Sequence, residues 1–132
     1  MREIKFRAWD DKEEIMTNFS FSDIKHDGLV PLYVNEHGID GYCDLQSDGI
    51  HIMQFTGLRD KNGVEIDEGD VVQMFGDYGE KRRCEVLFGD GYWIPLVRVE
   101  YGYNAIDRYD AEYFEVIGNI YENKELLNKE GL

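Results

Sequence analysis

Three histidines and two cysteines are the side chains best suited to metal binding or nucleophilic chemistry. They are His26, His37, His51, Cys43 and Cys84. A metal site needs ligands at a short and regular spacing, and the gaps between these residues are long. A metal cluster of His26, His37 and Cys43 and a nucleophilic dyad of Cys43 with His37 stay open as alternatives, but no local signature supports either. We therefore predict no catalytic, cofactor-binding or metal-binding residues and no cofactor.

Cys84 and the sequence Asp60-Lys61-Asn62-Gly63 favour structural interpretations. Cys84 alternates with apolar residues in an expected strand over Arg83–Phe88, as a small buried side chain does. The second motif is similar to part of a calcium-binding loop, but such a loop needs a ligand where Leu58 stands and is flanked by helices. Asn-Gly instead predicts a tight β-hairpin turn, since both residues accept positive φ angles.

Lys81-Arg82-Arg83 is the densest basic cluster of the chain. With Tyr78, Tyr92 and Trp93 it has the composition of a small strip that stacks bases and binds phosphates. The whole chain, however, carries 28 acidic and 14 basic residues, a formal net charge of -14. Because a field of that sign repels phosphate backbones and anionic lipids, we favour a solvated turn. We expect no direct nucleic-acid partner and no membrane association.

The composition predicts a folded cytoplasmic protein. The chain has 132 residues, of which 42% are hydrophobic and 14% aromatic, enough to bury a core. The opening residues, MREIKFRAWDDKEE, lack the apolar run of a signal peptide, and no stretch approaches the length that spans a bilayer. Two cysteines make no disulfide framework, so we expect both thiols to be reduced.

Alternating apolar residues predict a β-hairpin near the N-terminus, with strands at Ile4–Trp9 and Glu14–Phe21. Glycines and a proline are then dense from Ser22 to Asp48. Breakers at this density exclude a long helix and predict loops, with short strands at Leu32–Asn35 and around Tyr42.

The C-terminal half has the pattern of a small barrel. Strand-like segments with turns every few residues between Asp70 and Tyr121 predict an SH3-like fold. Pro95 lacks a backbone N–H, so the expected strand Tyr92–Tyr101 should lie at an edge or carry a bulge. We further predict a helical turn at Asn104–Asp110 and a short helix at Lys124–Lys129.

Three sequence blocks occur together in this chain, at Met1–Asp10, Met53–Val72 and Phe114–Leu127. They read MREIKFRAWD, MQFTGLRDKNG followed by EGDVV, and FEVIGNIYEN followed by ELL. In this order and spacing they closely resemble the YopX family of phage and prophage proteins. The resemblance implies a protein encoded by a bacterial phage or prophage, homo-oligomeric assembly, and no established catalytic residues.

The blocks consist mainly of glycines and apolar residues, which describe a scaffold more than an active site. We expect glycines at turns or close backbone approaches: Gly57, Gly63, Gly69 and Gly118. We expect the following core residues: Phe6, Trp9, Phe55, Ile66, Val71 and Ile117.

The predicted fold class is mainly β (β-rich α+β), in a single YopX-like domain over residues 1–132. It comprises an N-terminal hairpin and irregular region (1–56), a barrel-like β region (57–122) and a short C-terminal helix with a tail (123–132).

Our leading functional hypothesis is a non-enzymatic phage or prophage accessory protein in the cytoplasm of the bacterial host cell. It would act by self-assembly, as a homo-oligomer, and by binding a host or phage protein. Two alternatives stay open. One is an acidic nucleic-acid mimic that inhibits a host DNA-binding protein, and the other is a small metal-binding or hydrolytic enzyme that uses His26, His37 or Cys43.

Overall fold

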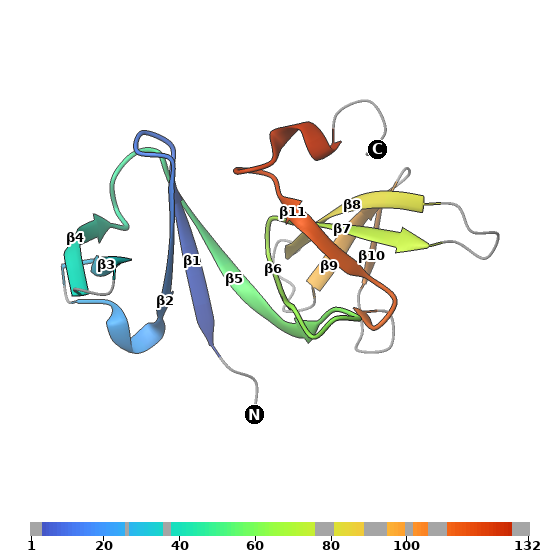
Figure 1. The fold of residues 1–132 in the computed structure, drawn as a ribbon, viewed down its shortest axis with the longest axis horizontal. Helices are drawn as coiled ribbons and strands as arrows, with labels where there is room; N and C mark the ends of the chain where they lie inside the picture. The colour runs from blue at the N-terminus through green and yellow to red at the C-terminus, as the bar shows by residue number, and fades with distance from the viewer. Residues whose placement is uncertain are drawn as a thin grey trace. The chain divides into compact units, whose positions relative to one another are not determined.

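The computed structural model describes residues 4–25, 27–35, 38–75, 81–88, 95–99, 102–105 and 111–127. They form antiparallel β-sheets and two short 3-10 helices, which confirms the mainly β prediction (Figure 1). The chain folds as two compact units, Met1–Phe55 and Thr56–Leu132. The single-domain arrangement stays a prediction. Within the described segments, no helix has the length and apolar character needed to cross a membrane.

The N-terminal unit begins with the predicted hairpin. Strand β1 (Lys5–Asp10) pairs with β2 (Ile15–Ser20) along its whole length. The other edge of β1 pairs with the first half of β5 (Ile50–Arg59). A single 3-10 turn, η1 (Phe21–Asp23), follows β2. The alternation of apolar residues therefore predicted these strands correctly.

The region from Ser22 to Asp48 is more regular than the sequence indicated. Strands β3 (Leu29–Asn35) and β4 (Gly38–Asp44) form a two-stranded hairpin, so the predicted short strands exist and are longer than expected. The register shifts twice between Pro31 and Asn35. Breaker residues are accommodated here as irregularities of the ladder, because in a short hairpin proline and glycine mark bulges as readily as loops.

A small apolar core joins this hairpin to β1 and β2. Its buried members are Ala8, Phe19, Val30 and Cys43. The rings of Phe6 and Phe19 stack at 5.5 Å between centroids. One buried residue from each of four strands thus packs the β3–β4 hairpin against β1 and β2.

The C-terminal unit contains a five-stranded antiparallel sheet in the order β10-β9-β8-β7-β11, and the short strand β6 (Glu65–Asp67) pairs with β5. The five strands are β7 (Asp70–Phe75), β8 (Lys81–Phe88), β9 (Pro95–Val99), β10 (Gly102–Ala105) and β11 (Glu115–Asn119). The core cluster consists of Ile66, Val72, Cys84, Val86, Ala111 and Phe114. Cys84 is 3% exposed, which confirms its prediction as a small buried side chain.

The expected core residues and glycines are largely confirmed. Trp9, Phe55, Ile66 and Val71 are buried, and Phe6 and Ile117 are partly buried. All four expected glycines are confirmed. Gly57, Gly63 and Gly69 adopt positive φ angles, and Gly118 lies at a close approach to the side chains of Asn123 and Leu126.

Four details of the sequence prediction are not confirmed, and two of them fall partly outside the described residues. The described strands form no closed barrel, so the SH3-like barrel is not confirmed. Pro95 is the first residue of an internal strand, paired with Phe88, and a first position tolerates the missing N–H. The C-terminal helix is a single 3-10 turn, η2 (Lys124–Leu127), and residues 128–132 lie outside the described part. Of the expected helical turn, residues 104–105 belong to β10, and residues 106–110 are outside that part too.

Candidate functional site

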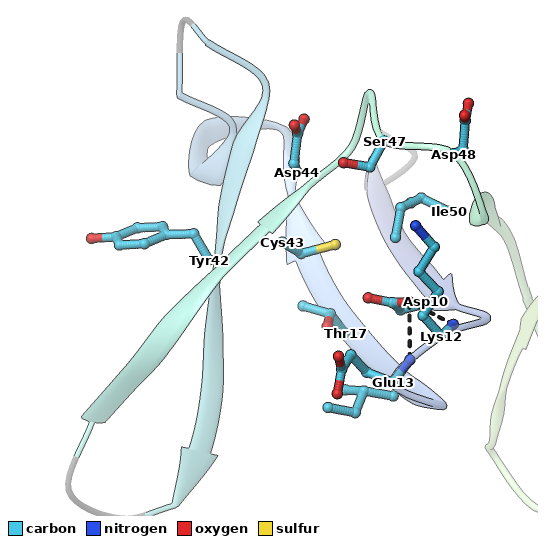
Figure 2. A pocket seen from close by; sticks show the side chains of 11 residues that line it. Asp10, Lys12, Glu13, Thr17, Tyr42, Cys43, Asp44, Ser47, Asp48 and Ile50 are labelled. Carbon is cyan, nitrogen blue, oxygen red and sulfur yellow. Dashed lines mark hydrogen bonds between the residues drawn. The ribbon is translucent and has the colours of Figure 1, made fainter.

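A cavity of about 280 Å³ opens in the N-terminal unit, where two turns lie next to each other (Figure 2). It is lined by the end of β1 with the turn into β2, and by the end of β4 with the turn into β5. The strand register places Asp10 between Ile15 and Ile50, so these side chains share one face of the sheet. The lining therefore combines apolar walls with charged groups.

Hydrogen bonds within the β1–β2 turn hold Asp10 in place. Its Oδ1 accepts the backbone N–H groups of Lys12 and Glu13, at 2.9 and 3.2 Å. Its carbonyl oxygen accepts the N–H of Glu14 at 2.8 Å, and Glu14 has a positive φ of 56°. An aspartate is favoured at such a position because its short side chain bonds to its own turn. The Asp10 carboxylate thus stabilises the turn. Figure 2 shows the Asp10 side chain on the side of the cavity that faces Cys43.

Asp44 stabilises the turn between β4 and β5 in the same way. Its Oδ1 accepts the N–H of Gln46 at 2.9 Å, and its carbonyl accepts the N–H of Ser47 at 3.1 Å. The two turns are joined by the N–H of Asp11, which donates to the carbonyl of Gly49 at 2.9 Å. Long-range backbone pairing therefore brings the acidic turns to one place.

Two buried polar side chains line the cavity between these turns. Thr17 is 6% exposed and Cys43 is 7% exposed. Burial raises the pKa of the Cys43 thiol above its ordinary value of 9.0, and the carboxylates of Asp10 and Asp44 raise that pKa further. Because a thiolate is the nucleophilic form, this environment works against catalysis by Cys43 at neutral pH.

We expect iodoacetamide to alkylate Cys43 more slowly in the folded protein than in the urea-unfolded chain. The raised pKa leaves less thiolate, so the rate should still climb steeply above pH 9.0. Asp44→Asn keeps an oxygen for the turn and removes a charge, and it should speed alkylation at fixed pH. Glu112→Gln, on an exposed residue outside the lining, is the matched control. A rate that levels off below pH 9.0 would contradict the raised pKa.

The histidines are not brought together in the described residues. His51 Nε2 lies 2.8 Å from Asp11 Oδ2, in an exposed pair at the start of β5. His26 and His37 lie outside the described part, so the structure does not test the metal cluster or the dyad with Cys43. In the segments that are described, no group of three or more His, Cys, Asp and Glu is arranged to hold a metal ion.

The Asp60–Gly63 motif is a hairpin turn, as predicted, and its aspartate is 5% exposed. The N–H of Gly63 donates to the carbonyl of Asp60 at 3.0 Å, and Gly63 has a φ of 80°. Asp60 Oδ1 accepts the N–H groups of Asn62 and Val64, at 2.8 and 2.9 Å. Its Oδ2 accepts the N–H of Val116 at 2.9 Å. Both carboxylate oxygens therefore bind backbone, which supports a structural role and not a calcium loop.

The basic cluster lies at the start of β8. Lys81 and Arg82 are exposed, whereas Arg83 is half-buried and donates from Nη1 to the carbonyl of Leu126 at 3.3 Å. This contact ties η2 to the sheet, so Arg83 has a structural partner. Tyr78, Tyr92 and Trp93 lie outside the described part, and a stacking strip stays untested.

Sequence reasoning missed the cavity carboxylates Asp10, Glu13, Asp44 and Asp48. The only signal was aspartate in turn-like surroundings, at Trp9-Asp10-Asp11 and near Asp48-Gly49. Such a signal is common to turns in general. It cannot indicate that two turns far apart in the sequence lie next to each other.

Comparisons with known proteins relate most of the chain to one family. Residues 5–128 match the family model described as YopX protein. The crystal structure of protein EF1440 from Enterococcus faecalis is similar, with a TM-score of 0.65 and 27% identity over 97% of this chain and 100% of that one. The crystal structure of protein yopX from Bacillus subtilis has a TM-score of 0.60 and 25% identity, over 94% and 98% of the two chains. No curated protein matches the chain.

Proposed function

The chain belongs to the YopX family, and on that premise we propose that it is a non-enzymatic phage or prophage accessory protein. It acts in the cytoplasm of the bacterial host by self-assembly and by binding a host or phage protein. The observation that carries this proposal is the chemistry of the cavity. Its carboxylates are hydrogen-bond acceptors, and burial together with the charges of Asp10 and Asp44 raises the pKa of the Cys43 thiol. Such groups favour recognition over covalent chemistry.

Exposed apolar side chains on the N-terminal unit support self-assembly. Apolar residues scattered singly on a surface are normal, but aromatic and apolar residues are also what interfaces bury. The larger exposed ones of this unit are Ile4, Ile15, Phe21, Tyr42 and Ile52. Phe21 is 69% exposed, so it is the best single residue with which to probe an interface.

Light scattering after size-exclusion chromatography should give a mass that is a multiple of the chain mass. The net charge of -14 opposes association of identical chains. Raising NaCl from 0.1 to 1 M shortens the screening length from about 10 to about 3 Å and should strengthen assembly. Phe21→Ser should weaken it, whereas Tyr113→Ser, at an exposed position of the other unit, serves as the control. A monomer at every salt concentration would contradict self-assembly.

We also retain the SH3-like barrel as a proposal for the C-terminal unit. It is supported by the strand order, in which β7 to β10 are consecutive neighbours and β11 returns to pair with β7.

The alternative of a nucleic-acid mimic receives less support. Four of the carboxylates line the cavity of the N-terminal unit, whereas a mimic needs its carboxylates in a row on an outer surface.

A further inference from the structure

The turn between β5 and β6 contains the only Asn-Gly pair of the chain, Asn62 followed by Gly63. Asparagine is a thermolabile residue, because its side-chain amide can be lost to attack by the backbone nitrogen that follows it. Glycine has no Cβ to obstruct this attack, so an asparagine before glycine is the most reactive. Both residues are exposed, and a Cβ at Gly63 would meet nothing within 4 Å. Water therefore reaches the pair, and space for the reaction is available.

The reaction at this pair is a deamidation, and it needs only water. The Gly63 nitrogen loses its proton to water and forms a bond to Asn62 Cγ, the bond from Cγ to Nδ2 breaks, and the departing nitrogen takes up a proton and leaves as ammonia. Water then opens the resulting cyclic imide. Opening at Cγ gives aspartate, whereas opening at the backbone carbonyl carbon gives isoaspartate, in which the main chain runs through the side chain.

In the folded turn, Asp60 holds the attacking nitrogen and both of its neighbours. The carbonyl oxygen of Asp60 accepts the N–H of Gly63 at 3.0 Å. Asp60 Oδ1 accepts the N–H groups of Asn62 and Val64, at 2.8 and 2.9 Å. Attack requires the Gly63 nitrogen to give up the proton that it donates to Asp60 and to rotate toward the Asn62 side chain. The closed turn therefore opposes the reaction, because these hydrogen bonds must break first.

We propose that Asn62 is a deamidation site that the β5–β6 turn keeps closed, with Asp60 as the residue that protects it. The reaction proceeds from the fraction of molecules in which this turn has opened locally. Isoaspartate adds a methylene group to the backbone after residue 62, so the N–H groups of the turn no longer match the spacing of the Asp60 oxygens. The bond from Asp60 Oδ2 to the Val116 N–H, which ties the turn to β11, is weakened with them. An opening that lasts long enough for the reaction thus becomes permanent.

Deamidation is measured on the full-length protein, incubated at mildly alkaline pH with and without guanidinium chloride. The peptide that contains Asn62 is followed by mass spectrometry after digestion in acid, since exchange of NH₂ for OH adds about 1 Da. Asn62 should react about tenfold or more slowly in the folded protein than in the unfolded chain. Asp60→Ala should accelerate the reaction of the folded protein about tenfold or more, because the bonds from the carboxylate to the N–H groups of Asn62 and Val64 are lost.

Two further variants separate opening of the turn from a general loss of stability. Val86→Ala creates a cavity in the core of the C-terminal unit and keeps every bond of Asp60, so the rate at Asn62 should stay within about twofold of the wild-type rate. Asp60→Asn keeps an oxygen for the turn and should give an intermediate rate, and it replaces Asp60→Ala in the test if circular dichroism shows that the alanine variant is unfolded. An Asn62 that stays intact in the unfolded chain, equal rates in folded and unfolded protein, or a folded Asp60 variant that reacts no faster than Val86→Ala would each overturn the inference.

Discussion

Replacement of Asp60 with alanine is expected to lower the free energy of unfolding by about 3 kcal/mol or more. The Asp60 carboxylate accepts three backbone N–H groups, those of Asn62, Val64 and Val116. The first two close the β5–β6 turn, and the third ties that turn to the start of β11. Alanine leaves all three donors without an acceptor at a site that is 5% exposed. Each buried donor left unsatisfied costs about 1–3 kcal/mol, and water can reach some of them.

Urea unfolding and amide hydrogen exchange together check this expectation. Exchange at Val64 and Val116 should accelerate in Asp60→Ala, since both amides lose their acceptor. Asp60→Asn should cost less, about 2 kcal/mol, because one oxygen is kept and an amide N–H₂ replaces the other. Glu115→Gln is the control, since the Lys61–Glu115 pair is 3.6 Å long and roughly two-thirds buried on each side, and it should cost less than about 1 kcal/mol. An alanine variant as stable as this control would refute the role of Asp60.

The second large effect is expected at Gly118, where alanine should cost about 2 kcal/mol. Gly118 follows a register shift between β7 and β11, and the chain then turns tightly into η2. A Cβ at this position would lie 2.5 Å from Asn123 Oδ1 and 2.6 Å from Leu126 Cδ1. Asn123 Oδ1 is held there because it accepts the N–H of Asn119 at 3.2 Å. Alanine must therefore push aside the side chains of Asn123 and Leu126, and the shift of Asn123 breaks this hydrogen bond.

Gly63 offers a matched comparison for Gly118. It has a φ of 80°, and a Cβ there would meet nothing within 4 Å. Gly63→Ala should therefore cost only the backbone strain, about 1 kcal/mol. In a double-mutant cycle, Gly118→Ala with Asn123→Ala should cost less than the sum of the single changes, because the Asn123 clash is already removed. Additive costs, or equal costs for the two glycine variants, would contradict a steric role for Gly118.

Local chemistry explains the parts of the fold that the sequence predicted well. The first hairpin, the Asn62-Gly63 turn and the inward direction of Cys84 each follow from residues within a few positions of one another. Alternation decides which face a strand residue occupies, and glycine or asparagine decides where the chain can adopt a positive φ. The same reasoning underestimated the β3–β4 hairpin. In that region, pairing between the two strands outweighs the local preference of the breaker residues.

By itself, the sequence determined the class of fold, most of the strands, the main turns and the acidic character that disfavours phosphate ligands. Only the tertiary structure decided which groups meet. Asp60 reaches Val116 across 56 residues, and the cavity joins a turn at Asp10 to another at Asp44. The physical reason is that hydrogen-bond partners and cavity walls are set by long-range strand register. A period-two pattern indicates the face on which a residue lies, but not which distant strand lies opposite.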